Sequence, residues 1–395
     1  MPGNREIFFN NIGLPSAHPP AIEIERAEGI FLFDAKGKKY FDLVSGVSVS
    51  SLGHSNPRVK EAVKKQIDAY MHLMVYGKFI QKPQVNLAEK LSRHLPDSLG
   101  CTYFVNSGSE AIEGALKLAK RYTGRTGIIS FKNAYHGGTH GALSVLGGEK
   151  MRQAFRPLLP DTRQLDFNDF SQLEHISNKT ACVLVEPIQA EAGIILPESG
   201  FLAAIRKKCD ETGSLLIYDE IQMGMGRTGK LFCFEHFGAI PDILCLAKAF
   251  GGGMPLGAFI ASKEIMHSLT NNPELGHITT FGGHPVSCAA SLAAFEELVN
   301  KMLFKKADEK GSLFEKLLKE HPEIKNIRRK GLMMGLDLEN TEKAAKLTAM
   351  FLEHGIIVDQ FLFRPEAFRI APPLIISDHE TREAADTILA CLDKL

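Results

Sequence analysis

Two charged residues stand directly after apolar runs, where few other polar side chains are present. Lys248 follows the run ILCLA and precedes AFGGG, and Asp219 follows the run LLIY. A lysine is seldom buried without a partner or a task, and a desolvated amine can form a Schiff base with a carbonyl. Asp219 comes at the carboxyl end of an expected parallel strand, where ligand crevices of α/β sheets open. The simpler alternatives are a lysine that reaches solvent from the strand end and an acid that caps a loop.

A third segment, VNSGSEAIEGALKLA, offers a place for an anion. Ser107, Gly108 and Ser109 fall where a strand ends and a helix begins, so free backbone N–H groups and two hydroxyls would suit a phosphate. The alternative is ordinary capping of the helix by Ser109. A phosphate cradle, an aromatic residue beside a glycine-rich loop in AYHGG, a strand-end acid and a semi-buried lysine are together what pyridoxal phosphate requires.

The segment GMGRTGK, from Gly224 to Lys230, supports a rival hypothesis from another class of function, a nucleotide-binding protein. It satisfies both the GxGxxG and the GxxxxGK spacing. However, Leu231 stands where the second pattern needs Ser or Thr to reach Mg²⁺, and DEIQM separates the segment from the preceding strand. Both mismatches weaken the nucleotide hypothesis.

The elements that would position these residues alternate between strand and helix from about residue 100 to 260. Short apolar runs indicate buried parallel strands, and helical patterns between them run over 110–122 and 200–212. We therefore predict an α/β fold with a large, mostly parallel sheet, followed by a small α+β domain. The first 50 residues contain a strand pair around the turn at 35–38, and a helix that Asn56 caps follows over 57–70. The predicted division is 1–55, a segment that packs with the small domain; 56–290, the large domain; and 291–395, the small domain.

The composition of the 395 residues excludes several classes of protein. Forty-four per cent hydrophobic residues exclude wholesale disorder, and 46 basic residues against 46 acidic ones leave no net positive charge to gather nucleic acid or anionic lipid. The seven cysteines form no CxxC pair, which favours reduced core residues. No zinc-type His/Cys cluster, signal peptide or membrane-length apolar stretch is present, so we expect a cytoplasmic protein without a metal site and without a nucleic-acid or membrane partner.

The chain resembles the class III aminotransferases, the pyridoxal-phosphate-dependent family that includes ornithine, acetylornithine and 4-aminobutyrate aminotransferases. The segments that carry the resemblance stand in the family's order and cover almost the whole chain: NSGSEAIEGALKLAKRYTGR, AYHGGTHGALS, VEPIQAEAGI, LLIYDEIQMGMGRTGK, DILCLAKAFGGGMPLGA, TTFGGHP and FRIAPPL. The resemblance implies an enzyme of fold type I, with a seven-stranded type of sheet and a homodimer whose active sites lie at the subunit interface.

Roles at the cofactor follow from the resemblance, motif by motif. Lys248 is implied to bind the cofactor's aldehyde and then to shuttle a proton, and Asp219 to pair with the pyridine nitrogen. The remaining cofactor-binding residues are expected to be Ser107, Gly108 and Ser109 at the phosphate, Thr280 reaching that phosphate from the neighbouring subunit, Tyr135 stacked on the ring, Gln222 at its 3′ oxygen, and His136 and Glu186 beside them.

Roles at the substrate are implied in the same way. Arg369 resembles the arginine that grips the α-carboxylate of glutamate and 2-oxoglutarate, and Glu191 the acid that neutralises this arginine when a terminal amine binds. Tyr76 is a further candidate on the substrate side. This implies amino transfer from a terminal amine such as ornithine or acetylornithine to 2-oxoglutarate, in two half reactions. Gly138 stands where many relatives have the arginine of HGRT, which argues against acetylornithine, and an aminomutase of the glutamate-1-semialdehyde type is the alternative within the family.

Overall fold

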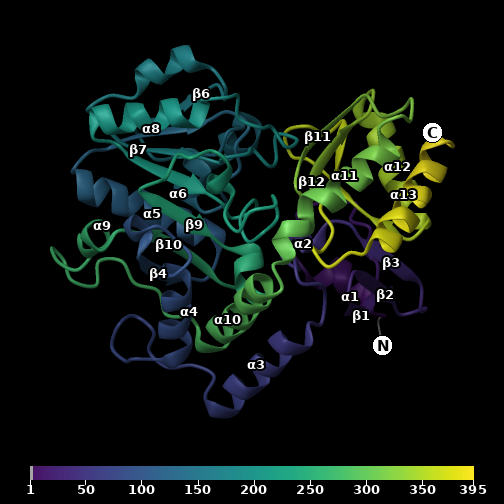
Figure 1. The fold of residues 1–395 in the computed structure, drawn as a ribbon, viewed down its shortest axis with the longest axis horizontal. Helices are drawn as coiled ribbons and strands as arrows, with labels where there is room; N and C mark the ends of the chain where they lie inside the picture. Colours follow the sequence, from purple (N-terminus) through teal and green to yellow (C-terminus); the bar gives the residue numbers. More distant parts are fainter. Residues whose placement is uncertain (1–2) are drawn as a thin grey trace.

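The computed structural model describes residues 3–395, which form two lobes (Figure 1). The large lobe is built on a seven-stranded sheet, and the small lobe combines the N-terminal strands with the C-terminal part of the chain from about residue 307. Within the described residues, no helix combines the length and the apolar character that crossing a membrane requires. All seven cysteines are free, and all but Cys101 are buried.

The large sheet has the order β4-β10-β9-β8-β7-β5-β6. The strands of this sheet are β4 Cys101–Val105, β5 Gly127–Phe131, β6 Thr162–Leu165, β7 Thr180–Val185, β8 Leu215–Asp219, β9 Ile243–Leu246 and β10 Gly257–Ala261. From β6 to β9 every neighbouring pair is parallel, which confirms the prediction of a mostly parallel sheet. The strands β7, β8 and β9 are buried throughout, as expected of strands that helices cover on both faces.

Two features of this sheet differ from the prediction. The run CTYFV was expected to be a buried parallel strand, but β4 is a half-buried edge strand whose only partner is the antiparallel β10. Strand β10, which pairs antiparallel with both β4 and β9, and strand β6 were not predicted. The reversal at β10 follows from its short connection to β9, because a parallel return needs a crossover of a dozen or more residues.

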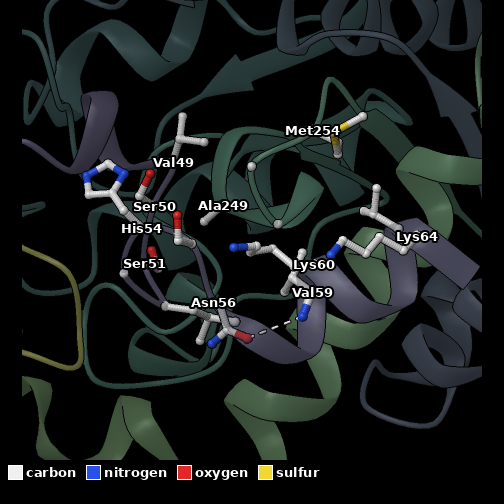
Figure 2. A pocket seen from close by; sticks show the side chains of 16 residues that line it. Val49, Ser50, Ser51, His54, Asn56, Val59, Lys60, Lys64, Ala249 and Met254 are labelled. Carbon is white, nitrogen blue, oxygen red and sulfur yellow. Dashed lines mark hydrogen bonds between the residues drawn. The ribbon is translucent and has the colours of Figure 1, made fainter. Parts of the chain in front are cut away.

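Helices cover the large sheet and line its edge. They are α2 Ser45–Ser48, α3 Pro57–Ala69, α4 Lys82–Ser92, α5 Gly108–Thr123, α6 His140–Ser144, α7 Glu149–Arg152, α8 Phe201–Thr212, α9 Lys263–His267 and α10 Pro285–Asn300. Helix α5 buries one apolar face against β7, β8, β9 and β10. The predicted cap of α3 is confirmed, since Asn56 Oδ1 accepts the N–H group of Arg58 at 3.1 Å and that of Val59 at 3.3 Å. Figure 2 shows the second of these bonds.

The small lobe contains two four-stranded sheets. One has the order β1-β2-β3-β13, with β1 Ile24–Glu28, β2 Phe31–Asp34, β3 Lys39–Asp42 and β13 Ile356–Ile357; the other has the order β11-β12-β15-β14, with β11 Asn326–Lys330, β12 Met333–Asp337, β15 Ala367–Ile370 and β14 Asp359–Gln360. The helices of this lobe are α1 Asn4–Asn11, α11 Ala307–Leu318, α12 Thr341–Glu353 and α13 Asp378–Leu392. The parallel pairing of β13 with β3 joins the two ends of the chain. Helix α10 runs through residues 290 and 291, where the sequence places a domain boundary, and the three-part division stays a prediction.

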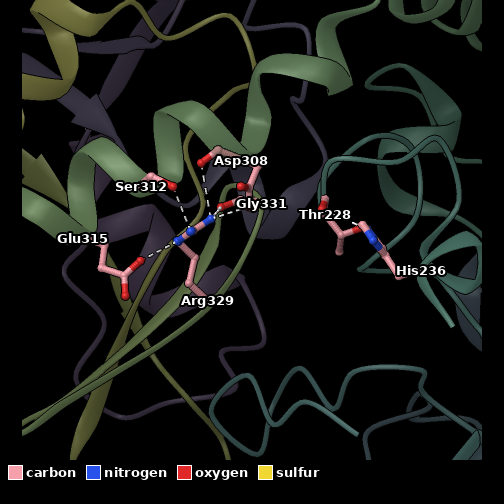
Figure 3. A network of polar contacts seen from close by, with 7 residues as sticks. All are labelled: Thr228, His236, Asp308, Ser312, Glu315, Arg329 and Gly331. Carbon is pink, nitrogen blue, oxygen red and sulfur yellow. Dashed lines mark hydrogen bonds and ion pairs between the residues drawn. The ribbon is translucent and has the colours of Figure 1, made fainter. Parts of the chain in front are cut away.

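One arginine fastens the second sheet of the small lobe to its covering helix. Arg329 of β11 donates hydrogen bonds to Glu315 at 2.9 Å, Asp308 at 2.7 Å and Ser312 at 2.9 Å on α11, and to the carbonyl of Gly331 at 3.2 Å (Figure 3). Because the planar guanidinium offers five N–H donors, the Arg329 side chain can bind residues on successive turns of α11. This network holds the framework from which β15 presents its own arginine to the site.

Candidate active site

A cavity of about 470 Å³ opens where the parallel strands of the large sheet end. The loops after β4, β5, β7, β8 and β9 all contribute to it, as expected for the carboxyl edge of such a sheet. The residues that the sequence predicted for the cofactor and that line this cavity are Ser107, Gly108, Ser109, Tyr135, His136, Glu186, Asp219, Gln222 and Lys248. The fold therefore brings together side chains spread over about 140 positions of the sequence.

The N-terminus of α5 forms one wall of the cavity. Ser107, and not Ser109, caps this helix, because Ser107 Oγ accepts the N–H of Glu110 at 3.2 Å. Ser109 Oγ instead accepts the N–H of Thr139 at 3.1 Å and contacts the Thr139 hydroxyl at 2.7 Å. A Cβ at Gly108 would lie 2.9 Å from the side chain of Ile221, so glycine keeps this end of the helix open. Helix dipole and backbone donors make the wall suitable for an anion.

Asp219 is the last residue of β8 and is held in a fixed orientation. Its Oδ2 lies 2.7 Å from Nδ1 of the buried His136, and its Oδ1 accepts the N–H of Ile221 at 3.0 Å. The Nε2 atom of His136 and the Nε2 atom of Gln222 are both buried without a hydrogen-bond partner in the described part of the chain. Buried polar atoms without partners are uncommon in proteins, and these two belong to residues that line the cavity.

Glu186 holds the loop that carries the aromatic residue. Its two carboxylate oxygens accept the N–H groups of Tyr135 at 3.0 Å and Ala190 at 2.8 Å. Burial raises the pKa of Glu186 to about 7; the nearby charge of Asp219 adds to the increase, and His136 opposes it. Both oxygens are thus engaged by the backbone, and Glu186 positions Tyr135, whose side chain is partly exposed at the cavity.

Lys248 begins the short 3-10 helix η5, Lys248–Gly251, directly after β9. Its φ of +50° lies in the left-handed region, which costs free energy for a residue with a Cβ. Burial lowers the pKa of the Lys248 amine; the charge of Arg369 lowers it further, whereas Glu191 raises it. A lysine whose amine loses its proton more readily is a better nucleophile and proton carrier.

Arg369 and Glu191 form a buried ion pair near Lys248. Arg369 Nη2 donates to Glu191 Oε1 at 2.7 Å, and the N–H of Leu362 donates to Glu191 Oε2 at 3.2 Å. The Phe361 ring lies under the guanidinium, with its centroid 4.8 Å from Cζ. Arg369 Nη1 has no hydrogen-bond partner in residues 3–395, so the guanidinium keeps a donor for a ligand.

Sequence reasoning missed Asp359, whose Oδ1 lies 3.3 Å from Arg369 Nε. Strand β14 pairs with β15 in a register that sets Asp359 directly opposite Arg369. The segment FRIAPPL that contains Arg369 was recognised in the sequence, but the register of β14 against β15 depends on tertiary packing and left no signal there.

Four predicted site residues do not line this cavity: Glu191 and Arg369, which form the buried pair described above, and Tyr76 and Thr280. Tyr76 lines a separate cavity of about 550 Å³, together with Gln84 and Thr279, and Thr280 is exposed on the adjoining segment. A single chain therefore does not bring Tyr76 or Thr280 to Lys248. Any role of these two residues at the cofactor or substrate would require a partner subunit, as the family resemblance implied for Thr280.

The structure does not favour the nucleotide hypothesis for GMGRTGK. The N–H groups of Gly224 and Gly226 donate to the carbonyls of Glu220 at 2.9 Å and Leu231 at 3.1 Å, so they are not free to cradle a phosphate. The buried Arg227 guanidinium donates to the carbonyls of Leu332 and Pro372 in the small lobe. Figure 3 shows His236 bound to Thr228 of the same loop. The loop therefore contacts both lobes, with its arginine hydrogen-bonded to the small lobe.

A further cavity of about 410 Å³ adjoins the one at Lys248, with which it shares Val49, Gly253 and Met254 (Figure 2). Lys60 and Lys64 of α3 line it, so this neighbouring cavity carries positive charge. In residues 3–395 no three His, Cys, Asp or Glu side chains form a group that could hold a metal ion.

Comparisons with known proteins relate this geometry to an enzyme family. Residues 13–392 match the family described as aminotransferase class III. The chain is 40% identical to the acetylornithine aminotransferase of Methanopyrus kandleri over 359 residues, which cover 90% of each chain. These matches also account for the order of the seven segments noted in the sequence.

Solved structures similar to this chain are also aminotransferases. The adenosylmethionine-8-amino-7-oxononanoate aminotransferase of Methanocaldococcus jannaschii is 30% identical, with a TM-score of 0.91 over 99% of this chain and 98% of its own. The ornithine aminotransferase of Toxoplasma gondii, described with partial occupancy of pyridoxal phosphate, is 28% identical, with a TM-score of 0.87 over 96% and 92%. The architecture is therefore that of the fold type I transaminases. The chain belongs to the class III aminotransferases, a pyridoxal-phosphate-dependent family of enzymes.

Proposed function

We propose that this enzyme moves an amino group from a terminal amine, with ornithine or acetylornithine as the leading donors, to 2-oxoglutarate. The observation that carries the proposal is the meeting of Lys248, Asp219 and the N-terminus of α5 at one cavity, next to the Arg369–Glu191 pair. The names of the relatives support the choice of donor, since they include acetylornithine and ornithine aminotransferases. The free cysteines support a cytoplasmic location.

The residues at the cavity fit pyridoxal phosphate. The open end of α5 suits the phosphate, the carboxylate of Asp219 suits the pyridine nitrogen, and the unpartnered Nε2 atom of Gln222 suits the 3′ oxygen. Tyr135 would cover the ring. When bound, pyridoxal phosphate supplies an aldehyde that condenses with amines and a ring that takes up electrons from the neighbouring carbon.

The protein's own side chains would then divide the work. Lys248 Nζ is the nucleophile, and once released it carries a proton to and from the substrate carbon, for which its lowered pKa suits it. Asp219, held by His136 and by the Ile221 N–H, would keep its partner nitrogen protonated. Glu186 would position Tyr135 through the backbone.

Arg369 and Glu191 would let one pocket accept two kinds of substrate. In the structure Glu191 pairs with Arg369 and neutralises its guanidinium. In this state the pocket can receive a donor that has no carboxylate next to its reacting amine. With Glu191 moved aside, the fork of Arg369 can bind the α-carboxylate of glutamate or 2-oxoglutarate. A switch of this kind serves an enzyme with two different substrates, so it favours transamination over the aminomutase alternative.

A conservative substitution tests the assignment of Arg369. Arg369→Lys keeps the charge that Glu191 requires but removes the planar fork, so the pocket loses a charged hydrogen bond to the dicarboxylate. We expect kcat/KM for 2-oxoglutarate to fall by the equivalent of about 1.5–3 kcal/mol, while kcat/KM for the amine donor changes much less. The matched control is Arg364→Lys, since Arg364 pairs with Asp337 on the same sheet. Equal losses for both substrates would contradict the assignment.

We further propose a homodimer with shared active sites. The proposal is supported by the positions of Tyr76 and Thr280, which lie away from the Lys248 cavity of their own chain. Light scattering of the cofactor-loaded protein should give the mass of two chains. A monomer that transfers amino groups at full rate would contradict the shared site.

The proposed reaction is tested by incubating the cofactor-loaded enzyme with ornithine and 2-oxoglutarate and measuring the glutamate formed. We expect glutamate to accumulate only when both substrates are present. Glutamate-1-semialdehyde is the comparison substrate, because an aminomutase would convert it without any acceptor. Conversion of this single substrate, with no glutamate formed from any amine, would favour the aminomutase.

A further inference from the structure

Asn106 connects two segments that belong to different cavities of the chain. It lines the Lys248 cavity and directly precedes Ser107, where the wall suited to a phosphate begins. Its side-chain Nδ2 donates to Thr279 Oγ1 at 2.9 Å. Thr279 lines the separate cavity of about 550 Å³ and is not among the residues that line the Lys248 cavity. One hydrogen bond therefore joins the phosphate wall to the segment that carries Thr279.

The orientation of the Asn106 side chain is fixed by the first turn of α5. The backbone N–H and the Nδ2 atom of Asn106 both donate to Glu110 Oε2, each at 2.8 Å. The N–H of Glu110 in turn donates to Ser107 Oγ at 3.2 Å. An asparagine amide has two N–H donors, and here Glu110 takes one and Thr279 the other. A shift of α5 would therefore be passed on to Thr279.

Residues 277–283, here called the arm, are held at both ends by their own chain. Tyr103 Oη on β4 donates to the His277 carbonyl at 2.6 Å. Gln84 Nε2 on α4 donates to the Gly283 carbonyl at 2.8 Å. Because both anchors come from the large lobe, the path of the arm is set by the subunit to which it belongs.

The middle of the arm is exposed. Ile278, Thr280 and Phe281 all reach solvent, and the exposed fractions of Ile278 and Phe281 are 48% and 54%. Neighbouring exposed apolar side chains favour a face that another chain covers. Thr279 lies among these residues but turns its hydroxyl back to Asn106. The arm thus presents Thr280 outward while Thr279 ties it to the phosphate wall.

We propose that Asn106 is a positioning residue for the active site of the partner subunit. Through Thr279 it holds Thr280 where this residue reaches the cofactor phosphate of the second chain, while Asn106 itself lines the cavity of its own chain. The inference rests on the proposed homodimer with shared sites and names the side chains that set the shared contact. Each chain then orients phosphate contacts in both sites of the dimer.

The variant Thr279→Val breaks this connection with little change in the size of the side chain. The readout is the half-life of the cofactor on the loaded enzyme after dilution, followed by its visible band. We expect the half-life to shorten about tenfold, because a hydrogen bond to a charged group contributes roughly that factor. Thr279→Ser keeps the hydroxyl and should retain the wild-type half-life. An unchanged half-life in Thr279→Val would overturn the proposal.

Thr270→Val is the matched control. Thr270 lines the same cavity as Thr279, but its hydroxyl donates to the carbonyl of His267 at 2.8 Å and not to the phosphate wall. The half-life of the cofactor should therefore stay at the wild-type value in Thr270→Val. A loss equal to that of Thr279→Val would overturn the proposal.

A double-mutant cycle tests whether Asn106 and Thr279 act together. Asn106→Ala removes the Nδ2 atom but keeps the backbone N–H that binds Glu110. If Thr279 acts through Asn106, the double variant should lose the cofactor no faster than Asn106→Ala alone. A double variant in which the two single effects multiply would show that Thr279 acts by another route, and would overturn the role of Asn106.

Mixed dimers separate an effect on the partner's site from an effect within one chain. Two chains with different tags are co-expressed, and only one of them keeps Lys248, so the visible band reports a single site. In the first dimer, Thr279→Val is on the chain that also carries Lys248→Ala. The intact Lys248 then receives the altered arm, and we expect the shorter half-life. In the second dimer, Thr279→Val is on the chain that keeps Lys248, and we expect the wild-type half-life.

Every other outcome of the mixed dimers counts against the proposal. A loss confined to the second dimer, or an equal loss in both, would place the effect of Thr279 within its own chain, and no loss in either would remove it. A monomer by light scattering would overturn the homodimer and this inference together. The half-life is measured without an amine, so the expected result in an enzyme that transfers no amino group from ornithine would refute the proposed reaction alone.

Discussion

Replacing Lys248 with alanine should abolish amino transfer. The substitution removes both the nucleophile that holds the cofactor and the group that carries the proton, and proton transfer alone contributes about 10²–10⁴-fold. We therefore expect turnover to fall by at least about 10⁴-fold, measured as glutamate formed from ornithine and 2-oxoglutarate. Since Lys248 has a positive φ, alanine at this site keeps the strained backbone and tests the side chain.

Two controls make this result specific. Lys230→Ala removes an exposed lysine from GMGRTGK and should leave turnover unchanged. Borohydride reduction followed by peptide mass spectrometry should place the cofactor on the peptide that contains Lys248 in the wild type, and on no lysine in Lys248→Ala. Near-normal turnover of Lys248→Ala, or a cofactor attached to another lysine, would contradict the assignment.

Replacing Asp219 with asparagine should have the second largest effect. Asparagine keeps the size of the side chain and its contact with His136, but it removes the negative charge at the end of β8. Without that charge the pyridine nitrogen would lose its proton more easily and the ring would accept electrons less well. We expect kcat to fall on the order of 10²–10³-fold, as for the loss of other preorganised electrostatic partners.

The measurement for this variant is the rate of the half reaction with ornithine, together with the amount of bound cofactor. Lys248 should still hold the cofactor in Asp219→Asn, so the loss should appear in the rate and not in cofactor content. Asp210→Asn, an exposed position on α8 that pairs with Arg206, is the matched control. A rate equal to that of the wild type would show that Asp219 does not act on the ring.

Much of the site could be predicted because parallel strands leave a local signal. The buried run that became β8 ends at Asp219, Lys248 follows the run that became β9, and parallel strands must end at one edge of the sheet. The N-terminus of α5 was equally visible, since NSGSE combines a strand end, a glycine and capping residues. The resemblance to a known family supplied the roles of Gln222, Arg369 and Glu191.

The parts that could not be predicted depend on contacts between distant segments. Nothing local shows that Ser109 binds Thr139 and leaves the cap to Ser107, because the loop at 139 returns to α5 only in the folded chain. Likewise, the contact of Asp359 with Arg369 depends on the register between β14 and β15. The positive φ of Lys248 also could not be read from its residue type, because a residue with a Cβ rarely adopts this conformation.

The most direct test of the central claim is the visible spectrum of the purified, cofactor-loaded enzyme before and after ornithine is added without an acceptor. We predict a yellow absorption band from pyridoxal phosphate bound at Lys248, and its loss as the cofactor takes up the amino group, with recovery on adding 2-oxoglutarate. With no tryptophan in the chain, this band is easy to follow. A protein that shows no such band after incubation with pyridoxal phosphate, or a band that no amine alters, would contradict the account.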